Sequence, residues 1–451
     1  MRLEHMRVKF LIFVLLNFSW ITACLLPLHL QAQKVAQTAV KQVNSTPTPR
    51  PDRIILTWQT DPTTSQTVTW RTDKSVKTPL AEIALADASA NFANYAKALP
   101  AQTEPLKTQT SEALYHSVNF TQLLPNTLYA YRVGDGTYWS EWFQFRTASQ
   151  EPEPFSFIYF GDVQNQVFSH WSRVIRAAYA EVPKAKFMLY VGDLINHPED
   201  DTEWQEWFAA GSFIHATVPN ILVAGNHEYT RNAVGFPRIT HHWAAQFNLP
   251  DNGIKSEPDL VYYTDYQNLR VISLNSYWKV PAQAKWLEEI LKNNPKKWTV
   301  VTCHYPIQST AIGRENENLL KHWQPILDKY KVDLVLQGHD HTYARGASSA
   351  SKENNGCLKT APVYVVSISG PKMYTLGDKE WLERGAENTQ LYQVITVEQD
   401  KLIYKSMTVT GELYDAFELQ KQKDEAARVT ELKTASKAER RFTNTLKAPT
   451  K

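Results

Sequence analysis

Apolar residues follow different patterns in two regions of the chain. Before residue 150, β-prone runs are short and separated by turn-forming residues; they cover 54–58, 67–70, 115–120, 129–133 and 142–145. Short strands at this spacing are typical of an antiparallel sandwich. We therefore predict an all-β sandwich domain over residues 53–149. Its tryptophans are expected in the core rather than on a sugar-binding surface; they are Trp58, Trp70 and Trp142.

After a joint at 150–154, runs that are apolar throughout alternate with segments of helical periodicity. The apolar runs cover 155–160, 187–191, 221–224, 298–303 and 334–336. Continuous apolarity indicates central strands that are covered on both faces. Helices are predicted around 171–178 and 286–291, where apolar residues recur at the spacing of one helix face. Residues 261–266 and 269–274 predict a hairpin. The pattern indicates an α/β layered domain over residues 154–418.

The N-terminal 32 residues have the features of a secretory signal peptide. Arg2, Arg7 and Lys9 precede an apolar run, and Ala32 supplies a small residue before the expected cleavage point. Two alternatives stay open: a retained membrane anchor, and a lipoprotein in which Cys24, at the end of an Ile-Thr-Ala-Cys sequence, is lipidated. We expect a secreted or periplasmic protein, or a lipid-anchored one, without a transmembrane helix in the mature chain.

The segments that flank the two domains are polar. Residues 33–52, rich in Gln, Thr, Ser and Pro, predict a flexible linker, and residues 419–451 predict a charged tail that is a solvated helix or disordered. Cys303 and Cys357 remain after signal removal, and Cys303 follows an apolar run, so we expect it to be a buried free thiol.

Length and charge limit the classes of function. A chain of 451 residues has room for two or three domains with complete cores. The formal net charge is +2, and the excess lies in the predicted signal peptide. The mature chain is therefore formally neutral and has no overall field that would attract nucleic acid. Any attraction for an anionic substrate must therefore come from charges at the binding site and not from the net charge of the chain.

Each of the five apolar runs ends in residues that can bind a metal ion. These residues are Gly161-Asp162-Val163-Gln164, Gly192-Asp193-Leu194-Ile195-Asn196, Gly225-Asn226-His227-Glu228, Cys303-His304 and Gly338-His339-Asp340-His341. The loops at the carboxyl ends of strands in an open α/β sheet converge on one crevice, so we expect the clusters to meet. Glycine before a ligand lets the backbone turn sharply and approach a metal closely.

Carboxylate, imidazole and amide ligands in this number suit a pair of metal ions. Two cations about 3.5–4 Å apart can stabilise the attacking and the leaving oxygen of a phosphoryl displacement. Such a pair requires a carboxylate that bridges both ions. The clusters therefore predict a dinuclear centre for phosphate-ester hydrolysis.

The five clusters, in this order, resemble the signature of the metallophosphoesterase (calcineurin-like) superfamily. The preceding domain, which looks like a fibronectin type III module, makes the chain more similar to purple acid phosphatases. Residues 67–72, 131–134 and 338–345 also match stretches of that family. The resemblance covers roughly residues 50–418 and implies two transition-metal ions, Fe, Mn or Zn.

The resemblance also implies a role for each motif residue. Asp162 and His341 would bind the first metal and Asp193 would bridge. Asn226, His304 and His339 would bind the second metal. His227 would face the substrate phosphate and assist the transition-state charge or protonate the leaving alkoxide, with a purely structural hydrogen bond as the alternative. We expect Glu228 to support its loop and Asp340 to point away from the metals.

One position departs from the purple acid phosphatase pattern. That family has a tyrosine three residues after the bridging aspartate, and its phenolate on ferric iron gives the colour; this chain has Asn196 there. Other metallophosphoesterases have a histidine two residues after the first aspartate, where this chain has Gln164. Gln164 or Asn196, or water, would complete the first metal site. Amide oxygens donate less charge, so we expect a colourless enzyme.

The resemblance thus implies a secreted phosphatase that hydrolyses small phosphate monoesters by direct attack of a metal-bound hydroxide. A phosphodiesterase or nucleotide-cleaving enzyme on the same scaffold is one alternative. A non-catalytic cell-surface binding protein is another, although it predicts erosion of the ligand set. The loops 229–259 and 307–318 carry Arg231, Arg238 and Arg314, which could line a substrate pocket or lie on the surface.

Overall fold

The computed structural model describes residues 43–108, 112–348, 360–423, 425–432 and 438–441. The predicted signal peptide, Cys24 and Cys357 lie outside these residues. The chain divides into two units after Asn44, and the following description concerns the second unit, Ser45–Lys451.

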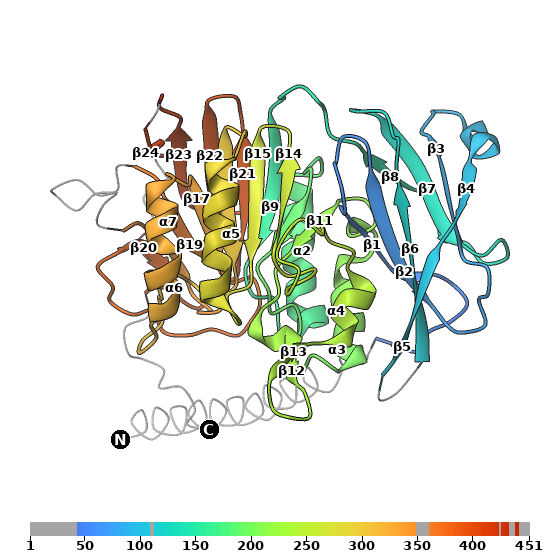
Figure 1. The fold of residues 1–451 in the computed structure, drawn as a ribbon, viewed down its shortest axis with the longest axis horizontal. Helices are drawn as coiled ribbons and strands as arrows, with labels where there is room; N and C mark the ends of the chain where they lie inside the picture. Colours follow the sequence, from blue (N-terminus) through green and yellow to red (C-terminus); the bar gives the residue numbers. More distant parts are fainter. Residues whose placement is uncertain (1–42, 109–111, 349–359, 424, 433–437, 442–451) are drawn as a thin grey trace, which may run out of the picture. The chain divides into compact units, whose positions relative to one another are not determined.

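The first domain is a sandwich of two antiparallel four-stranded sheets, as predicted (Figure 1). One sheet has the order β1-β2-β6-β5, made by Asp52–Thr57, Gln66–Thr72, Glu112–Phe120 and Gln102–Lys107. The other has the order β4-β3-β7-β8, made by Lys97–Pro100, Leu80–Leu85, Leu128–Gly134 and Phe143–Arg146. Trp58 and Trp70 are buried. Trp142 is only partly buried and packs edge-on against Phe92.

The second domain contains two seven-stranded sheets rather than a single open sheet. The first sheet has the order β11-β10-β9-β21-β22-β23-β24. Its strands are Asn220–Leu222, Met188–Tyr190, Phe155–Phe160, Leu391–Val397, Lys401–Thr408, Leu413–Gln420 and Arg428–Glu431. The second has the order β14-β15-β16-β17-β19-β18-β20. Its strands are Tyr262–Tyr266, Leu269–Leu274, Trp298–Cys303, Leu334–Gln337, Val363–Val366, Tyr343–Gly346 and Leu382–Ala386. β14 and β15 form the predicted hairpin. A short ribbon pairs β12 (Tyr229–Arg231) with β13 (Pro237–Ile239).

Successive side chains of a central strand in the second sheet point to opposite faces, and both faces are covered by a hydrophobic core. In β16, Trp298 and Val300 belong to the core shared with the first sheet, whereas Val301 and Cys303 belong to the core beneath the helices. These helices are α5 (Val280–Lys292), α6 (Glu317–His322) and α7 (Gln324–Lys329), which lie in front of this sheet in Figure 1. The domain also contains the α-helices α2 (Ser172–Glu181), α3 (Asp201–Gly211) and α4 (His241–Gln246). It has shorter helical turns as well: η2 (Val167–Trp171), η3 (Ser212–Ile214) and η4 (Asn226–Glu228). Cys303 is buried, as predicted, and forms no disulfide with any residue that the structure describes.

The described parts of the predicted linker and tail differ from the expectation. Pro47 is buried and the Thr48 carbonyl accepts a hydrogen bond from Asp73 N, so packing begins before residue 53. In the predicted tail, Arg428–Glu431 forms β24 against β23, and Glu431 pairs with buried Arg345. The prediction of a solvated helix or disordered segment was wrong there, because the buried partner strand and Arg345 lie far away in the sequence.

The sandwich is joined to the second domain by a buried polar network. Arg53 and Arg71 donate to the two carboxylate oxygens of Asp201, at 2.9 and 3.1 Å, in the first turn of α3. Arg71 also pairs with Asp52 at 2.7 Å. Both arginine side chains are fully buried and that of Asp201 is 3% exposed. The network fixes the start of α3 relative to β1 and β2.

Candidate metal centre

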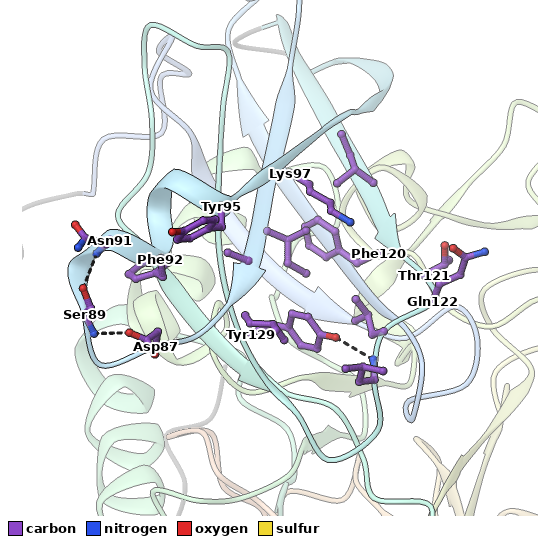
Figure 2. Close-up of a pocket in the computed structure, with 16 residues that line it drawn as sticks. Asp87, Ser89, Asn91, Phe92, Tyr95, Lys97, Phe120, Thr121, Gln122 and Tyr129 are labelled. Carbon is purple, nitrogen blue, oxygen red and sulfur yellow. Dashed lines mark hydrogen bonds between the residues drawn. The ribbon is translucent and has the colours of Figure 1, made fainter.

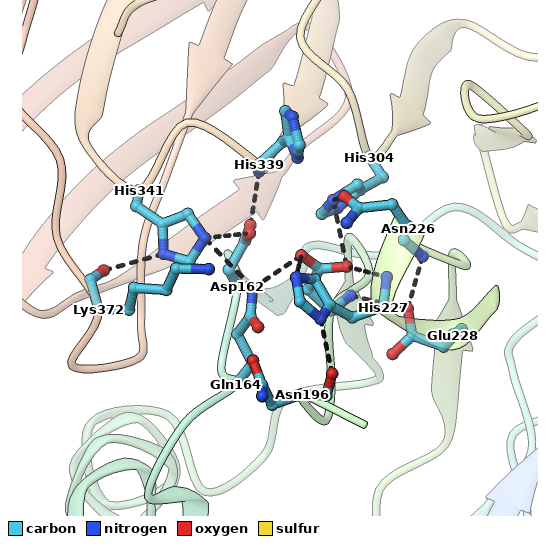
Figure 3. Close-up of polar contacts among 12 residues, drawn as sticks. Asp162, Gln164, Asn196, Asn226, His227, Glu228, His304, His339, His341 and Lys372 are labelled. Carbon is cyan, nitrogen blue, oxygen red and sulfur yellow. Dashed lines mark hydrogen bonds and ion pairs between the residues drawn. The ribbon is translucent and has the colours of Figure 1, made fainter. Parts of the chain in front are cut away.

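The five clusters predicted from strand ends converge at one point of the second domain (Figure 3). Asp162 follows β9, Asp193 follows β10, Asn226 follows β11, His304 follows β16, and His339 and His341 follow β17. Three of these strands belong to one sheet and two to the other. The site therefore lies where the carboxyl ends of two sheets meet.

Two groups of possible ligands share one residue. The ligand atoms of Asp162, Asp193 and His341 lie within 4.8 Å of one another, and so do those of Asp193, His304 and His339. Asn226 Oδ1 lies 3.1 Å from His304 Nε2, which places it with the second group. The position of Asp193 in both groups is the one required of a bridging carboxylate.

Close backbone packing explains the glycines in these loops. A Cβ atom on Gly225 would lie 2.2 Å from Asp193 Oδ1, and one on Gly338 would lie 2.2 Å from Asp162 Oδ1. Any side chain at either position would displace a carboxylate. The ligand backbone is itself strained, since Asp193, His339 and His341 adopt positive φ angles of 52°, 71° and 46°. Strain of this kind persists where the surrounding structure imposes it, commonly at functional sites.

The electrostatics of the cluster favour a bound cation. Asp162 is fully buried, burial raises its pKa to about 7, and its Oδ2 atom has no hydrogen-bond partner. Burial also lowers the pKa values of His339 and His341, to about 2 and about 3, so both rings are neutral and can donate a lone pair to a metal. Burial would lower the pKa of His304, but attraction to Asp193 and Asp162 outweighs it and raises the value to about 9. The donor set fits two transition-metal ions.

The two candidates for the additional ligand have different positions. The Gln164 amide lies in the cluster, with Nε2 2.8 Å from Asp193 Oδ2 and 3.2 Å from His341 Nε2. Its Oε1 is buried without a hydrogen-bond partner. A rotation of the amide by 180° would point the oxygen at Asp193 and His341, where the first metal is expected. The Asn196 side chain instead contacts the exposed ring of His197, at 3.1 Å. The structure thus brings Gln164 into the cluster and not Asn196.

His227 lies at the edge of the cluster and is partly exposed. Its backbone N–H donates to Asp193 Oδ1 at 2.9 Å. Its Nδ1 lies 2.7 Å from the Asn196 carbonyl oxygen, and its Nε2 lies 3.9 Å from Asp193 Oδ2. The backbone of this residue therefore positions the shared carboxylate while its ring faces the ligands. The His227 side chain is 27% exposed, so its ring remains available to a substrate.

Two acidic residues near the site have supporting roles. Glu228 accepts hydrogen bonds from the backbone N–H groups of Asp193, Leu194 and Gly225, at 2.9, 2.7 and 2.7 Å. It supports the second and third loops together, more than the single loop expected. Asp340 points away from the ligands, as expected, and accepts from the backbone of Thr310 and Ala311.

The sequence pattern did not reveal Glu203, which supports the same site from α3. One oxygen of its carboxylate accepts from the backbone N–H groups of both Asn196 and His197, at 2.7 Å each. The other lies 2.7 Å from His197 Nδ1. Glu203 thereby fixes the carbonyl that contacts His227. A glutamate in the first turn of a helix is common, so nothing in its local pattern signals this contact.

Models of two protein families match the chain in succession. Residues 51–147 match the purple acid phosphatase N-terminal domain, and residues 155–343 match the calcineurin-like phosphoesterase domain. The first match covers the sandwich, and the second covers every ligand named above.

Three curated relatives are identical to this chain at less than a third of the aligned residues. A purple acid phosphatase of Glycine max is 29% identical over 312 residues, covering 62% of each chain. The Fe(3+)-Zn(2+) purple acid phosphatase 12 of Arabidopsis thaliana is 28% identical over 294 residues, covering 58% of this chain and 60% of that one. An uncharacterized Mycobacterium tuberculosis protein is 29% identical over 322 residues and is covered to 59% of its length. The chain thus spans about three fifths of the length of these relatives.

Solved structures show the same fold. A purple acid phosphatase from yellow lupin seeds, PPD1, superposes with a TM-score of 0.69 at 18% identity, covering 82% of this chain and 74% of that one. PhoD superposes with a TM-score of 0.61 at 13% identity, covering 89% and 96%. At these identities the likeness is one of fold.

Proposed function

Since the chain belongs to the purple acid phosphatase-like metallophosphoesterases, we propose that it hydrolyses phosphate monoesters at a pair of transition-metal ions. One observation carries the proposal: Asp193 belongs to both groups of possible ligands, and within each group the ligand atoms lie within 4.8 Å of one another. A shared carboxylate between two sets of imidazole and carboxylate donors suits two-metal phosphoryl transfer.

The ligands divide between two metal positions. Asp162, Gln164 and His341 would hold the first ion, and Asn226, His304 and His339 the second, with Asp193 common to both. The ions, Fe, Mn or Zn, would supply Lewis-acid activation of water and neutralise charge on the phosphate. The near-complete ligand set disfavours a purely non-catalytic binding role.

His227 would act on the phosphate from the edge of the cluster. Its Nδ1–H donates to the Asn196 carbonyl, so Nε2 is the nitrogen that faces the reaction. When Nε2 is protonated, it can donate to a phosphate oxygen and then transfer its proton to the alkoxide as the P–O bond breaks. When Nε2 carries no proton, it can neither donate a hydrogen bond to the phosphate nor protonate the alkoxide. Positioned acids of this kind contribute roughly 10²- to 10⁴-fold.

A comparison of two substrates tests the monoester assignment. Metal-reconstituted protein should hydrolyse p-nitrophenyl phosphate faster than bis-p-nitrophenyl phosphate. The reverse preference would assign a phosphodiesterase to this site. Metal analysis of the same sample should give about two transition-metal ions per chain; fewer than one after reconstitution would contradict the dinuclear assignment.

We further propose that the substrate is a small molecule and that the N-terminal signal directs export. The near-neutral mature chain supports the first point, because it carries no net positive charge that would attract a nucleic acid. The basic and apolar N-terminal residues support the second. Among the residues that the structure describes, no helix has the length and apolarity to cross a membrane.

A further inference from the structure

Two loops form a rim beside His339 and His341. The loops 307–318 and 371–377 are joined by hydrogen bonds from Gly377 N to Thr310 O and from Ile312 N to Thr375 O, at 2.7 and 3.4 Å. Tyr374 N also donates to His341 O at 3.1 Å. The rim is therefore held directly against a metal-ligand loop, so its side chains have defined positions relative to the metals.

The Arg314 guanidinium lies at the rim, and some of its N–H groups make no hydrogen bond to the described residues. Its Nη1 lies 3.3 Å from His339 O and 3.2 Å from Asp340 Oδ1, and the side chain is 34% exposed. Its Cζ lies 4.8 Å from the centre of the Tyr374 ring. The Nε and Nη2 atoms have no hydrogen-bond partner within the described ranges. A guanidinium fixed through one nitrogen can present the others to an anion.

Lys372 places a second cation at the same ring. Its carbonyl accepts from His341 Nδ1 at 2.9 Å, and its Nζ lies 5.6 Å from the Tyr374 ring centre. Figure 3 shows the side chain extending beneath the His341 ring on the side of Gln164. No carboxylate pairs with this ammonium in the part of the chain that the structure describes. The rim therefore has an uncompensated positive charge, since Asp340 offsets Arg314 but nothing offsets Lys372.

We propose that Arg314 and Lys372 form an anion subsite that binds a second anionic group, phosphoryl or carboxylate, of the phosphate ester. The inference deepens the proposed function and rests on it. Two cations near one ring repel each other, and an anion bound next to them offsets this repulsion. A substrate with a single phosphate places its anion at the metals and leaves the rim uncompensated. A substrate with a second anion satisfies both sites.

Three phenyl phosphates that differ at the para position test this subsite in metal-reconstituted protein. They are phenyl phosphate, 4-carboxyphenyl phosphate and 1,4-phenylene bisphosphate. Lys372→Met should lower the ratio of kcat/KM for the bisphosphate to that for phenyl phosphate by about five- to tenfold, the range between exposed and desolvated charge pairs. A fall confined to the bisphosphate would define the ligand as a phosphoryl group, and an equal fall for the carboxylate would define a general anion site.

Lys285→Met is the matched control, because Lys285 is an exposed lysine on α5. It should leave both ratios at their wild-type values. If Lys372→Met lowers the rates on all three substrates equally, the ammonium contacts the reacting phosphate and the subsite proposal is wrong.

Binding of phosphonates separates this inference from the proposed function. Calorimetric titration of the metal-loaded protein should show tighter binding of 1,4-phenylenediphosphonate than of phenylphosphonate, and Lys372→Met should remove the difference. That result without any hydrolysis would support the subsite and contradict the phosphatase. Hydrolysis of phenyl phosphate without a preference for the diphosphonate would contradict the subsite alone.

Discussion

The Nδ1 atom of His227 lies 2.7 Å from the carbonyl oxygen of Asn196. A carbonyl only accepts, so Nδ1 carries the proton and Nε2 faces Asp193. Asn196 occupies the position of the tyrosine that gives purple acid phosphatases their colour, yet it contributes its backbone instead of a ligand atom. The loop that lacks the phenolate thus orients the proposed acid.

Glu203 should control the orientation of His227 through this loop. Glu203→Gln keeps the shape but weakens two charge-assisted hydrogen bonds, from the N–H groups of Asn196 and His197. We expect kcat to fall about tenfold, with a smaller change in KM. Glu206→Gln, on the same helix, is the control. An unchanged kcat in Glu203→Gln, or an equal fall in Glu206→Gln, would contradict the positioning role.

Iron-loaded protein should lack the intense visible band of a tyrosinate-iron complex. Asn196 replaces the tyrosine, and Gln164, an amide, occupies the first group of ligands. Absorption spectra after reconstitution with ferric iron provide the measurement. Gln164→Glu should raise metal affinity, because it adds a negative donor. A strong charge-transfer band in the unmodified protein would rule out this ligand assignment.

The buried network between the domains should be strongly stabilising against the loss of one partner. Asp201→Ala leaves Arg53 and Arg71 without the carboxylate that pairs with both. Breaking a buried ion pair in this way typically costs about 3–5 kcal/mol of unfolding free energy. Chemical denaturation measures the change. Glu112→Ala, which removes the exposed partner of Lys74, should have little effect; equal losses would show that the network is no stronger than a surface pair.

Three buried histidines outside the metal centre should make stability depend on pH. Burial lowers the pKa values of His116 and His242 to about 4 and that of His215 to about 3, whereas an unfolded histidine titrates near 6.5. The unfolded chain therefore binds more protons below pH 6.5, and the unfolding free energy falls as the pH drops from about 6.5 towards 4. At pH 5 each histidine should contribute a loss of about 2 kcal/mol relative to pH 7. In denaturation at both pH values, His116→Gln should show a smaller loss; the same pH dependence as wild type would exclude His116 as a source.

The strand ends and glycines made it predictable which polar residues meet at the site, because a polar residue after a buried strand is a local pattern. Gly225 and Gly338 carry that signal most clearly, since a side chain there would meet Asp193 or Asp162. Local pattern also predicted β9, β16 and the hairpin of β14 and β15.

Contacts between residues that are far apart in the chain could not be predicted from the local sequence pattern. Arg53, Arg71 and Asp201 are charged residues of the kind normally found on the surface, and only their mutual pairing makes burial possible. Arg428–Glu431 became a strand because β23 offers it an edge. The local pattern also could not show which of Gln164 and Asn196 points its side chain into the ligand cluster, because that depends on how each loop folds.

The phosphatase account depends most on Asp193, the residue common to both ligand groups. Asp193→Asn keeps the size of the side chain and removes its negative charge. With metal-loaded protein and p-nitrophenyl phosphate, we expect kcat to fall at least 100-fold, a loss of about 2.7 kcal/mol or more of transition-state stabilisation, while circular dichroism shows the fold intact. Turnover near the wild-type rate in a folded Asp193→Asn protein would contradict catalysis by a shared two-metal centre.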